Sequence, residues 1–130
     1  MTQKKKPAPP NPKELIGSRK ASLRYIPMSV WPHDGAAHAV GAAKYGPFNW
    51  RDDPVEAMTY IEASLRHLIA YAAGENLDPE SRVSQLAHVR ACCAILMDAE
   101  LHGTLIDNRH ESPGTLEVLK QFDRSKNPCE

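Results

Sequence analysis

A first long stretch of the chain, residues 54–73, carries apolar residues at the spacing of an α-helix. Its apolar positions are Val55, Met58, Ile61, Leu65, Leu68, Ile69 and Ala72. The steps of three and four match the helical period rather than the strand period. Asp53 and Pro54 suit the N-cap and the first helical position, and Gly74 suits the end. We therefore predict a helix over residues 54–73.

A second stretch, residues 81–101, has apolar residues around most of its circumference, which is typical of a helix buried on more than one side. These residues are Val83, Leu86, Ala87, Val89, Ala91, Ala94, Ile95, Met97 and Leu101. The connection to the first helix is short, so we predict an antiparallel hairpin. Such a hairpin places His67 level with His88, and Glu62 level with Cys92.

Shorter elements complete the expected fold. An alanine-rich stretch over residues 33–45, with Asp34 near its start and Gly46 after it, predicts a further helix, and residues 113–122 predict a short amphipathic one. Residues 14–32 are interrupted by prolines, and we expect them to pack across the helices as an irregular arm. No stretch shows convincing strand alternation, so the sequence predicts an all-α helical bundle built on the hairpin.

The large aromatic residues and the chain ends set the expected domain limits. Tyr25 and Trp31 would be costly to leave exposed, which is why the arm is expected to be packed. Residues 1–12 are rich in lysine and proline and are expected to be a disordered tail. We predict one domain over residues 13–122 and a frayed C-terminus over residues 123–130.

Composition narrows the class of protein. The 130 residues include 16 basic and 16 acidic side chains, for a net charge of +0. This balance argues against non-specific nucleic-acid binding, which depends on neutralising phosphates. No apolar run could span a membrane and no secretory signal is evident, so we expect a cytoplasmic protein. Cys92, Cys93 and Cys129 are expected to be reduced, the first two as core filler rather than zinc ligands.

Carboxylates gather near the connection between the two long helices. They are Glu62, Glu75, Asp78 and Glu80. Oxygen ligands of this kind suit Mg²⁺ or Mn²⁺, which can bridge phosphate oxygens and lower the pKa of a bound water. The alternative is that Glu75 and Glu80 only cap and charge the start of the second helix, which suits Glu80 better than all four carboxylates together. His67 and His88, at matching depth beside these acids, are candidates for ligation or proton transfer.

The segment over residues 44–51 combines three aromatic rings, an amide and two cations. Rings can stack on a base, the amide can read its edge, and Lys44 and Arg51 can meet phosphate. The alternative is that Phe48 and Trp50 only plug the end of the core.

Several motifs together resemble a known family. They are Gly41-Ala42-Ala43-Lys44-Tyr45-Gly46, Asn49-Trp50-Arg51, Arg66-His67, Gly74-Glu75, Asp78, Glu80-Ser81 and His88. This pattern resembles the phage family described as the dATP/dGTP diphosphohydrolase N-terminal domain. That family is similar to the all-α MazG-like pyrophosphohydrolases, which cleave nucleoside triphosphates between the α and β phosphates with Mg²⁺ or Mn²⁺. The resemblance thus implies a phage enzyme of nucleotide-pool metabolism, acting on purine deoxynucleoside triphosphates.

The chain departs from the related patterns at three places. The MazG-type signature has its Glu-x-x-Asp pair within a helix, whereas Glu75 and Asp78 fall in the predicted connection. The MazG-type signature has a second glutamate three residues after the first, where this chain has Leu65 after Glu62. Members of the resembled family often have glycine after the Glu-Ser pair, and here Arg82 stands there.

The residues and the resemblance together give a set of expected roles. Catalysis is assigned to Glu62, Glu75, Asp78 and His67. Metal binding is assigned to Glu62, Glu75, Asp78, Glu80 and His88. Substrate binding is assigned to Lys44, Tyr45, Asn49, Trp50, Arg51 and Arg66. We expect a homo-oligomer, a dimer or tetramer, because such bundles usually share sites across subunits. A non-catalytic nucleotide-binding protein or a structural helical accessory protein is the alternative.

Overall fold

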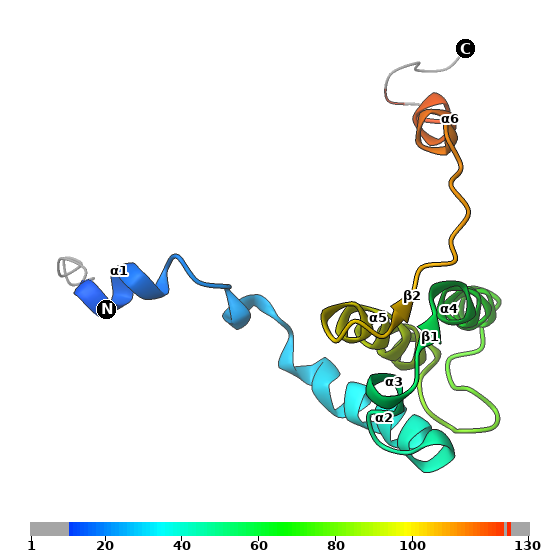
Figure 1. Ribbon diagram of the computed structural model, residues 1–130, viewed down its shortest axis with the longest axis horizontal. Coiled ribbons are helices and arrows are strands. Elements are labelled where there is room, and N and C mark those ends of the chain that lie inside the picture. The colour runs from blue at the N-terminus through cyan, green and yellow to red at the C-terminus, as the bar shows by residue number, and fades with distance from the viewer. Residues whose placement is uncertain (1–10, 124, 126–130) are drawn as a thin grey trace, which may run out of the picture.

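The fold is all-α, as predicted, in a computed structural model that describes residues 11–123 and 125 (Figure 1). The helices are α1 (Pro12–Gly17), α2 (Trp31–Tyr45), α3 (Asn49–Asp52), α4 (Ala57–Ala72), α5 (Gln85–Leu101) and α6 (Thr115–Gln121). Two 3₁₀ turns, η1 (Leu23–Tyr25) and η2 (Met28–Val30), precede α2. The strands β1 (Val55–Glu56) and β2 (Leu105–Ile106) form one small parallel pair.

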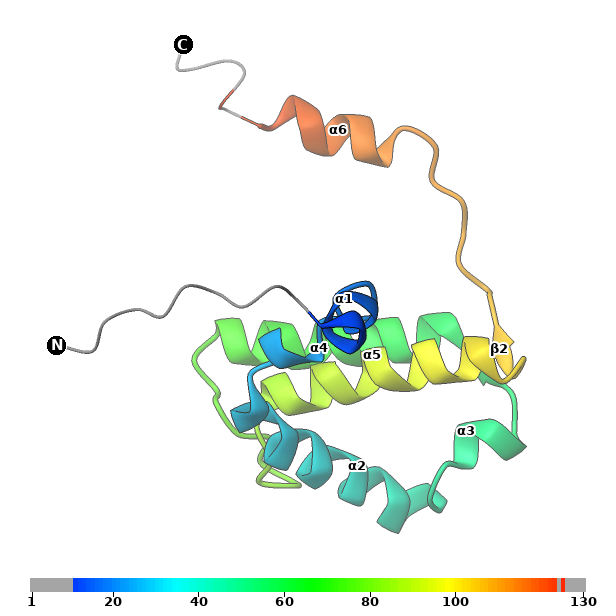
Figure 2. The ribbon, with the colours of Figure 1, turned by 90° about the vertical axis from the view of Figure 1, so that its left-hand side faces the viewer.

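The predicted hairpin is confirmed: α4 and α5 lie side by side and run in opposite directions, with α2 packed across α5 (Figures 1 and 2). The buried core between α2 and α5 consists of Ala37, Ala87 and Ala91, with Val83 packed against it. Small side chains let helix backbones approach closely, so this packing leaves room for polar groups on the same faces. Among residues 11–123, no helix combines the length and apolar character that a membrane crossing requires.

Both long helices begin later than predicted. Helix α4 starts at Ala57 rather than residue 54, because Asp53 ends α3 and Val55 pairs with Leu105 in β1. Helix α5 starts at Gln85, with Ser84 as its N-cap residue, and residues 81–84 belong to the connection. Glu80 therefore lies outside the first turn of α5, and the helix-charging alternative for it is wrong.

The ends of α2 and α4 follow the sequence prediction. Gly46 directly follows α2 with φ +90°, and Gly74 follows α4 with φ +103°. Both values lie in the region that only glycine adopts without strain. The chain can therefore turn sharply after each helix, which brings the segments over residues 47–52 and 75–84 back towards the helix bundle.

The strand pair and one side chain fix the start of α4. Val55 N donates to Thr104 O at 2.9 Å, which continues the pairing beyond the two-residue strands. Glu56, the N-cap residue, makes no side-chain capping bond itself. Instead Asn108 Oδ1 accepts from Met58 N at 2.9 Å, and Asn108 Nδ2 donates to Glu56 at 3.1 Å. A residue fifty positions away thus caps the helix.

The expectation of a packed N-terminal arm is wrong. Tyr25 is 81% exposed and Trp31 is 52% exposed, and α1 projects away from the body, as does α6 at the other end (Figures 1 and 2). The prolines keep η1 and η2 short, so no long apolar face forms to dock on the bundle. The tail predicted over residues 1–12 lies outside the described residues up to residue 10, and the predicted frayed end lies outside them at 124 and 126–130.

Candidate active-site cleft

A cleft of about 660 Å³ lies among α2, α4, α5 and the connection between the long helices. Ligand sites in proteins commonly have volumes of this order. The residues with polar side chains that line it are Lys44, Tyr45, Asn49, Thr59, Tyr60, Arg66, His67, Asp78, Glu80, Ser81 and His88. The cleft therefore brings together cations, carboxylates, imidazoles and phenol rings from four separate parts of the chain.

The two histidines of the cleft stack on each other, as the predicted hairpin register requires. The ring centroids of His67 and His88 lie 4.7 Å apart with 14° between the planes. His88 Nε2 contacts Ser81 Oγ at 2.8 Å. Burial, together with the neighbouring His67, lowers the pKa of His88 below its usual range. The lowered pKa favours the neutral imidazole of His88, and its ring provides a flat wall for His67.

His67 is also the end of a short hydrogen-bonded chain. Its Nδ1 lies 2.6 Å from Gln85 Oε1, and Gln85 Nε2 donates to Glu75 Oε1 at 2.6 Å. Gln85 is only 2% exposed, which makes it the most completely buried polar residue of the described chain. Glu75, assigned from the sequence to catalysis and metal binding, is thus hydrogen-bonded to this amide.

The connection that carries the acids is tightly organised. Asp78 N donates to Val83 O, and Arg82 N donates to Asp78 O, both at 2.8 Å. Asp78 Oδ2 accepts from Ser81 N at 2.8 Å, and this bond holds the pKa of Asp78 below its usual range. Arg82 adopts φ +62°, a left-handed conformation that disfavours side chains other than glycine. Asp78 is thus fixed, ionised and turned into the cleft lining.

Lys44 and Glu80 face each other across the cleft. Lys44 Nζ lies 3.0 Å from Glu80 Oε1, and the two side chains remain substantially exposed. The hydrogen bond to Glu80 raises the pKa of Lys44, so the ammonium is charged. An exposed pair of this kind contributes little stability. An anionic ligand can therefore compete with Glu80 for Lys44 at small cost.

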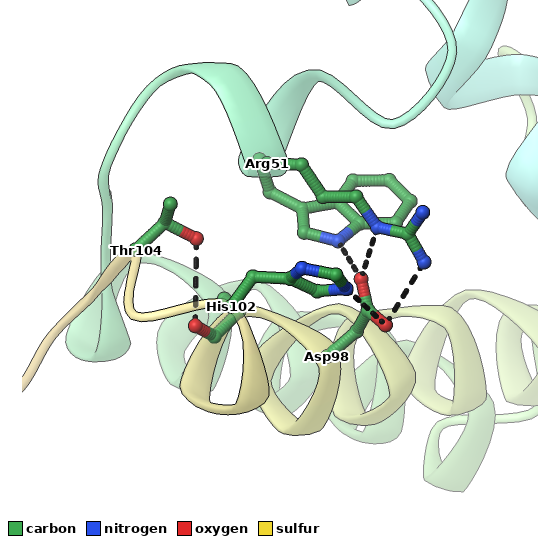
Figure 3. A network of polar contacts seen from close by, with 6 residues as sticks. Arg51, Asp98, His102 and Thr104 are labelled. Atoms are coloured by element: carbon green, nitrogen blue, oxygen red, sulfur yellow. Dashed lines mark hydrogen bonds and ion pairs between the residues drawn. The ribbon is translucent and has the colours of Figure 1, made fainter.

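Trp50 and Arg51, expected beside Lys44, lie around a separate cavity of about 480 Å³ that also borders Phe48. Asp98 Oδ2 accepts from Trp50 Nε1 at 2.7 Å and from Arg51 Nε at 2.8 Å, and Asp98 Oδ1 accepts from Arg51 Nη2 at 3.1 Å. Figure 3 shows Arg51, Asp98 and His102 converging over α5. The guanidinium also lies 4.4 Å from the Phe48 ring centroid.

The geometry thus divides the motif over residues 44–51 into two parts. Lys44, Tyr45 and Asn49 line the cleft, whereas Trp50 and Arg51 hold α3 against α5. The donors of Arg51 are occupied by the carboxylate of Asp98, and these hydrogen bonds lower the pKa of Asp98 to about 2. Glu62 is exposed and lies outside the residues that line the cleft.

Three polar residues of this region were given no role by the sequence reasoning. The hairpin register already places Gln85 at the polar end of the hairpin, and Ser81 belongs to a motif of the resembled family, whereas Tyr60 was not considered. Tyr60 lines the cleft seven positions before His67, and Ser81 contacts His88. Gln85 lies three positions before His88 on α5. In both helices these spacings keep the residues on one face. A search for polar residues in register with His67 would have found Tyr60, whereas the contact of Ser81 depends on the turn.

The two adjacent thiols of α5 differ in burial. Cys92 is free and buried, as expected of core filler, and burial raises the pKa of its thiol. Cys93 is exposed, so its assignment as core filler is wrong. Cys129 lies outside the described residues.

The donor set of the cleft fits a cation that is shared with phosphate. Within residues 11–123 and 125, no group of three His, Cys, Asp or Glu side chains is placed to hold a metal ion. Asp78 and Glu80 are the two carboxylates of the lining. Mg²⁺ commonly takes one or two protein carboxylates and completes its shell with phosphate oxygens and water. The cleft suits that mode better than a preformed protein cage.

Comparison with known proteins adds the family. Residues 10–109 match the family described as "dATP/dGTP diphosphohydrolase, N-terminal". The chain belongs to this family. The match to the dATP/dGTP diphosphohydrolase family takes in α2 to β2, and so includes the whole cleft. No curated protein and no solved structure matches the chain significantly.

Proposed function

We propose that the chain hydrolyses purine deoxynucleoside triphosphates, dATP or dGTP, to the monophosphate and pyrophosphate. The observation that carries the proposal is the cleft, because one cavity of about 660 Å³ offers cations, carboxylates, imidazoles and aromatic rings together. The family description names the same substrates and a diphosphohydrolase activity. As part of this proposal, the chain acts in nucleotide-pool metabolism, in the cytoplasm of a phage-infected cell.

The substrate would be held by residues from both walls of the cleft. Lys44 and Arg66 supply positive charge for the triphosphate. Tyr45 and Tyr60 supply rings on which a purine can stack, and the Asn49 amide can pair with the edge of the base. When phosphate binds Lys44, it displaces Glu80, which frees that carboxylate on the same side of the cleft as Asp78.

Asp78 and Glu80 are the residues that would hold Mg²⁺ or Mn²⁺ in this proposal. The hydrogen bond from Ser81 keeps Asp78 ionised, so it is ready as an oxygen ligand. The cation, when bound, would supply charge neutralisation on the phosphate oxygens. The orientation of Asp78 by the backbone of the connection would fix where that charge lies in the cleft.

The test is to incubate the purified protein with each deoxynucleoside triphosphate and Mg²⁺ or Mn²⁺, and to separate the products by chromatography. We expect monophosphate and pyrophosphate from the purine substrates. Asp78→Asn keeps the shape of the side chain but removes its charge, and should lower kcat/KM by roughly 100-fold or more. Asp107→Asn, outside the cleft lining, is the matched control. Full activity of Asp78→Asn would contradict the proposed role of this carboxylate.

A non-catalytic nucleotide-binding protein is the second candidate. It is favoured by the engagement of two of the acids, Glu80 with Lys44 and Glu75 with Gln85. This candidate predicts no product. A nucleotide at one hundred times its dissociation constant should still stabilise the protein by about 2.7 kcal/mol, measured as a rise in melting temperature.

We further propose that the protein is a homo-oligomer. The fully buried apolar residues of the described chain are alanines and one cysteine, Cys92. Larger apolar side chains remain outside, among them Met97, 72% exposed, and Leu101, 81% exposed, on α5. A second copy that covers this helix would complete the burial predicted for it from its sequence.

A further inference from the structure

Gln85 is a buried amide with a demanding environment. It is the largest fully buried side chain of the described residues, at the first position of α5. A buried amide is strongly destabilising unless both of its ends are hydrogen-bonded. Both ends are bonded, one to Glu75 and the other to His67, each at 2.6 Å. The end of the amide that faces Glu75 therefore decides which end faces His67.

That direction is determined by the carboxylate. A carboxylate can only accept hydrogen bonds, so the NH₂ group of Gln85 faces the Glu75 oxygen. The carbonyl oxygen of Gln85 then faces His67, and an oxygen of this kind can only accept. Nδ1 of His67 must therefore carry the hydrogen. A neutral imidazole has one N–H, so Nε2 of His67 is left with its lone pair.

Nε2 of His67 is an accessible nitrogen on a residue that lines the cleft. It takes part in none of the hydrogen bonds formed among the described residues, in which His67 is bonded through Nδ1. Among the described residues that are buried or partly buried, every side-chain nitrogen or oxygen that is fully enclosed has a hydrogen-bond partner. Nε2 is therefore accessible, and the ring to which it belongs lines the cleft. The stacked ring of His88 restrains the plane in which this nitrogen lies.

On this basis, and resting on the proposed function, we propose that Glu75 and Gln85 are positioning residues that hold His67 in the tautomer with hydrogen on Nδ1, so that Nε2 acts as the proton acceptor of the reaction. The attacking water gives one proton to Nε2, and its oxygen forms a bond to a phosphorus of the α,β-anhydride. The bond from that phosphorus to the bridging oxygen breaks, and the electron pair stays on the leaving phosphate group. A base oriented by a second hydrogen-bonded group is a recurring arrangement in hydrolases.

This proposal gives Glu75 a different part from a cation ligand. A cation ligand would act through the negative charge of the carboxylate, whereas this positioning residue acts because its side chain can only accept from Gln85. Glu75→Gln keeps an oxygen but adds an NH₂ group that can donate to a flipped Gln85 amide, and Glu75→Ala removes the partner altogether. Because Glu75 is exposed, neither substitution should disturb the packing of the body. Both variants should therefore release the direction of the Gln85 amide, whereas loss of a cation ligand would leave the tautomer of His67 in the free protein unchanged.

The first measurement is the ¹⁵N chemical shift of each ring nitrogen of His67 in the free protein, by NMR at neutral pH. We expect Nδ1 protonated and Nε2 unprotonated in the wild type. In Glu75→Gln, Glu75→Ala and Gln85→Met, the population with hydrogen on Nε2 should rise. Hydrogen on Nε2 in the wild-type protein would overturn the proposal. Helical circular dichroism of each variant shows whether the body remains folded.

The second measurement is steady-state turnover of the purine triphosphate. We expect Glu75→Ala and Glu75→Gln each to lower kcat by about 10- to 100-fold with little change in KM. Unchanged turnover in both variants would overturn the positioning role. If the wild type shows no turnover of any triphosphate, the proposed function and the proton-transfer step both fall, while the tautomer assignment would stand on the NMR result alone.

Discussion

Asp98 shows how one side chain can hold two helices at a fixed distance. Its carboxylate accepts from Trp50 and Arg51 of α3, and His102 lies 3.5 Å away, one turn further along the chain. These donors favour the ionised form, which lowers the pKa of Asp98 to about 2. Asn49, next to Trp50, lines the cleft. The anchoring of α3 therefore also fixes where Asn49 stands.

The lowered pKa of Asp98 makes a prediction about stability and pH. Its folded pKa lies below the ordinary value of 3.8, so its contribution is fully present above about pH 4 and is lost as pH falls towards 2. Asp98→Asn should therefore lower the melting temperature at pH 7, and the difference from wild type should narrow between pH 4 and pH 2. Thermal unfolding followed by circular dichroism across this range measures it.

Asp107→Asn is the control for that series. Its pKa is also about 2, but its partner Arg109 is only two residues away. Such a local pair can persist in the unfolded chain, so its removal should change the pH dependence much less. A constant difference between Asp98→Asn and wild type down to pH 2 would contradict the role given to Asp98.

At the scale of elements, the sequence predicted each long helix but not where it begins. The helical periodicity over residues 54–73 and 81–101 and the glycine stops at 46 and 74 were sufficient for the hairpin and for the pairing of His67 with His88. The starts of α4 and α5 were missed because they depend on contacts from distant parts of the chain. Pairing of β1 with β2 delays α4, and the turns after Asp78 delay α5.

The same distinction holds for the candidate site. Lys44, Tyr45, Asn49, Arg66, His67, Asp78, Glu80 and His88 were expected from the motifs, and the structure gathers them around one cleft. The direction of Trp50 and Arg51 towards Asp98 could not be read from their position in the motif, because it depends on α5. Gln85 was placed at the polar end of the hairpin but given no role, because its importance comes from burial rather than from its neighbours in sequence.

The distant cap of α4 can be tested by a single substitution. Asn108→Ala removes the acceptor for Met58 N and the bond to Glu56. Loss of a helix cap of this kind lowers the free energy of unfolding by about 1 kcal/mol, which corresponds to a melting temperature lower by about 4 °C. Calorimetry measures the shift.

Asn11→Ala is its matched control. Asn11 Oδ1 caps α1 by the same type of bond, to Glu14 N at 2.9 Å. Because α1 projects from the body, its cap should not affect the main unfolding transition (Figure 1). Equal shifts in the two variants would show that the cap supplied by Asn108 has no special place in the fold.

Arg82 gives a prediction about backbone strain in the connection. A left-handed conformation costs a residue with a side chain about 1–2 kcal/mol of free energy, a cost that glycine does not incur. Arg82→Gly removes that strain at φ +62° and should raise the melting temperature, whereas Arg82→Ala keeps the strain and should not. A lower melting temperature for the glycine variant than for the alanine variant would contradict this account.

At the scale of the whole molecule, one chain leaves much of its apolar surface uncovered. Leu86, Cys93, Met97 and Leu101 follow one face of α5 at spacings of seven and four, and all four are exposed. Helices α1 and α6 also carry exposed leucines and extend from the body (Figure 1). A core of alanines alone supplies little hydrophobic stabilisation, so partner contacts would add what the single chain lacks.

The oligomer proposal predicts the effect of charge on this face. Wild-type protein should have a multiple of the monomer mass in light scattering after gel filtration. Met97→Glu combined with Leu101→Glu should shift it to the monomer, because a buried unpaired carboxylate is strongly unfavourable. Ala39→Glu, at an exposed position of α2, is the control. A monomeric wild type would contradict the proposal.

The backbone bonds of the connection also restrict how the chain can change over evolutionary time. Gln85 N is bound to Asn76 O, and Asp78 is bound through its backbone to both Val83 and Arg82. Inserting or deleting a residue between positions 76 and 85 would break this ring of bonds and shift the carboxylates relative to the histidines. Related chains that share the chemistry should therefore keep the number of residues in this segment, and vary in length before α2 and after β2.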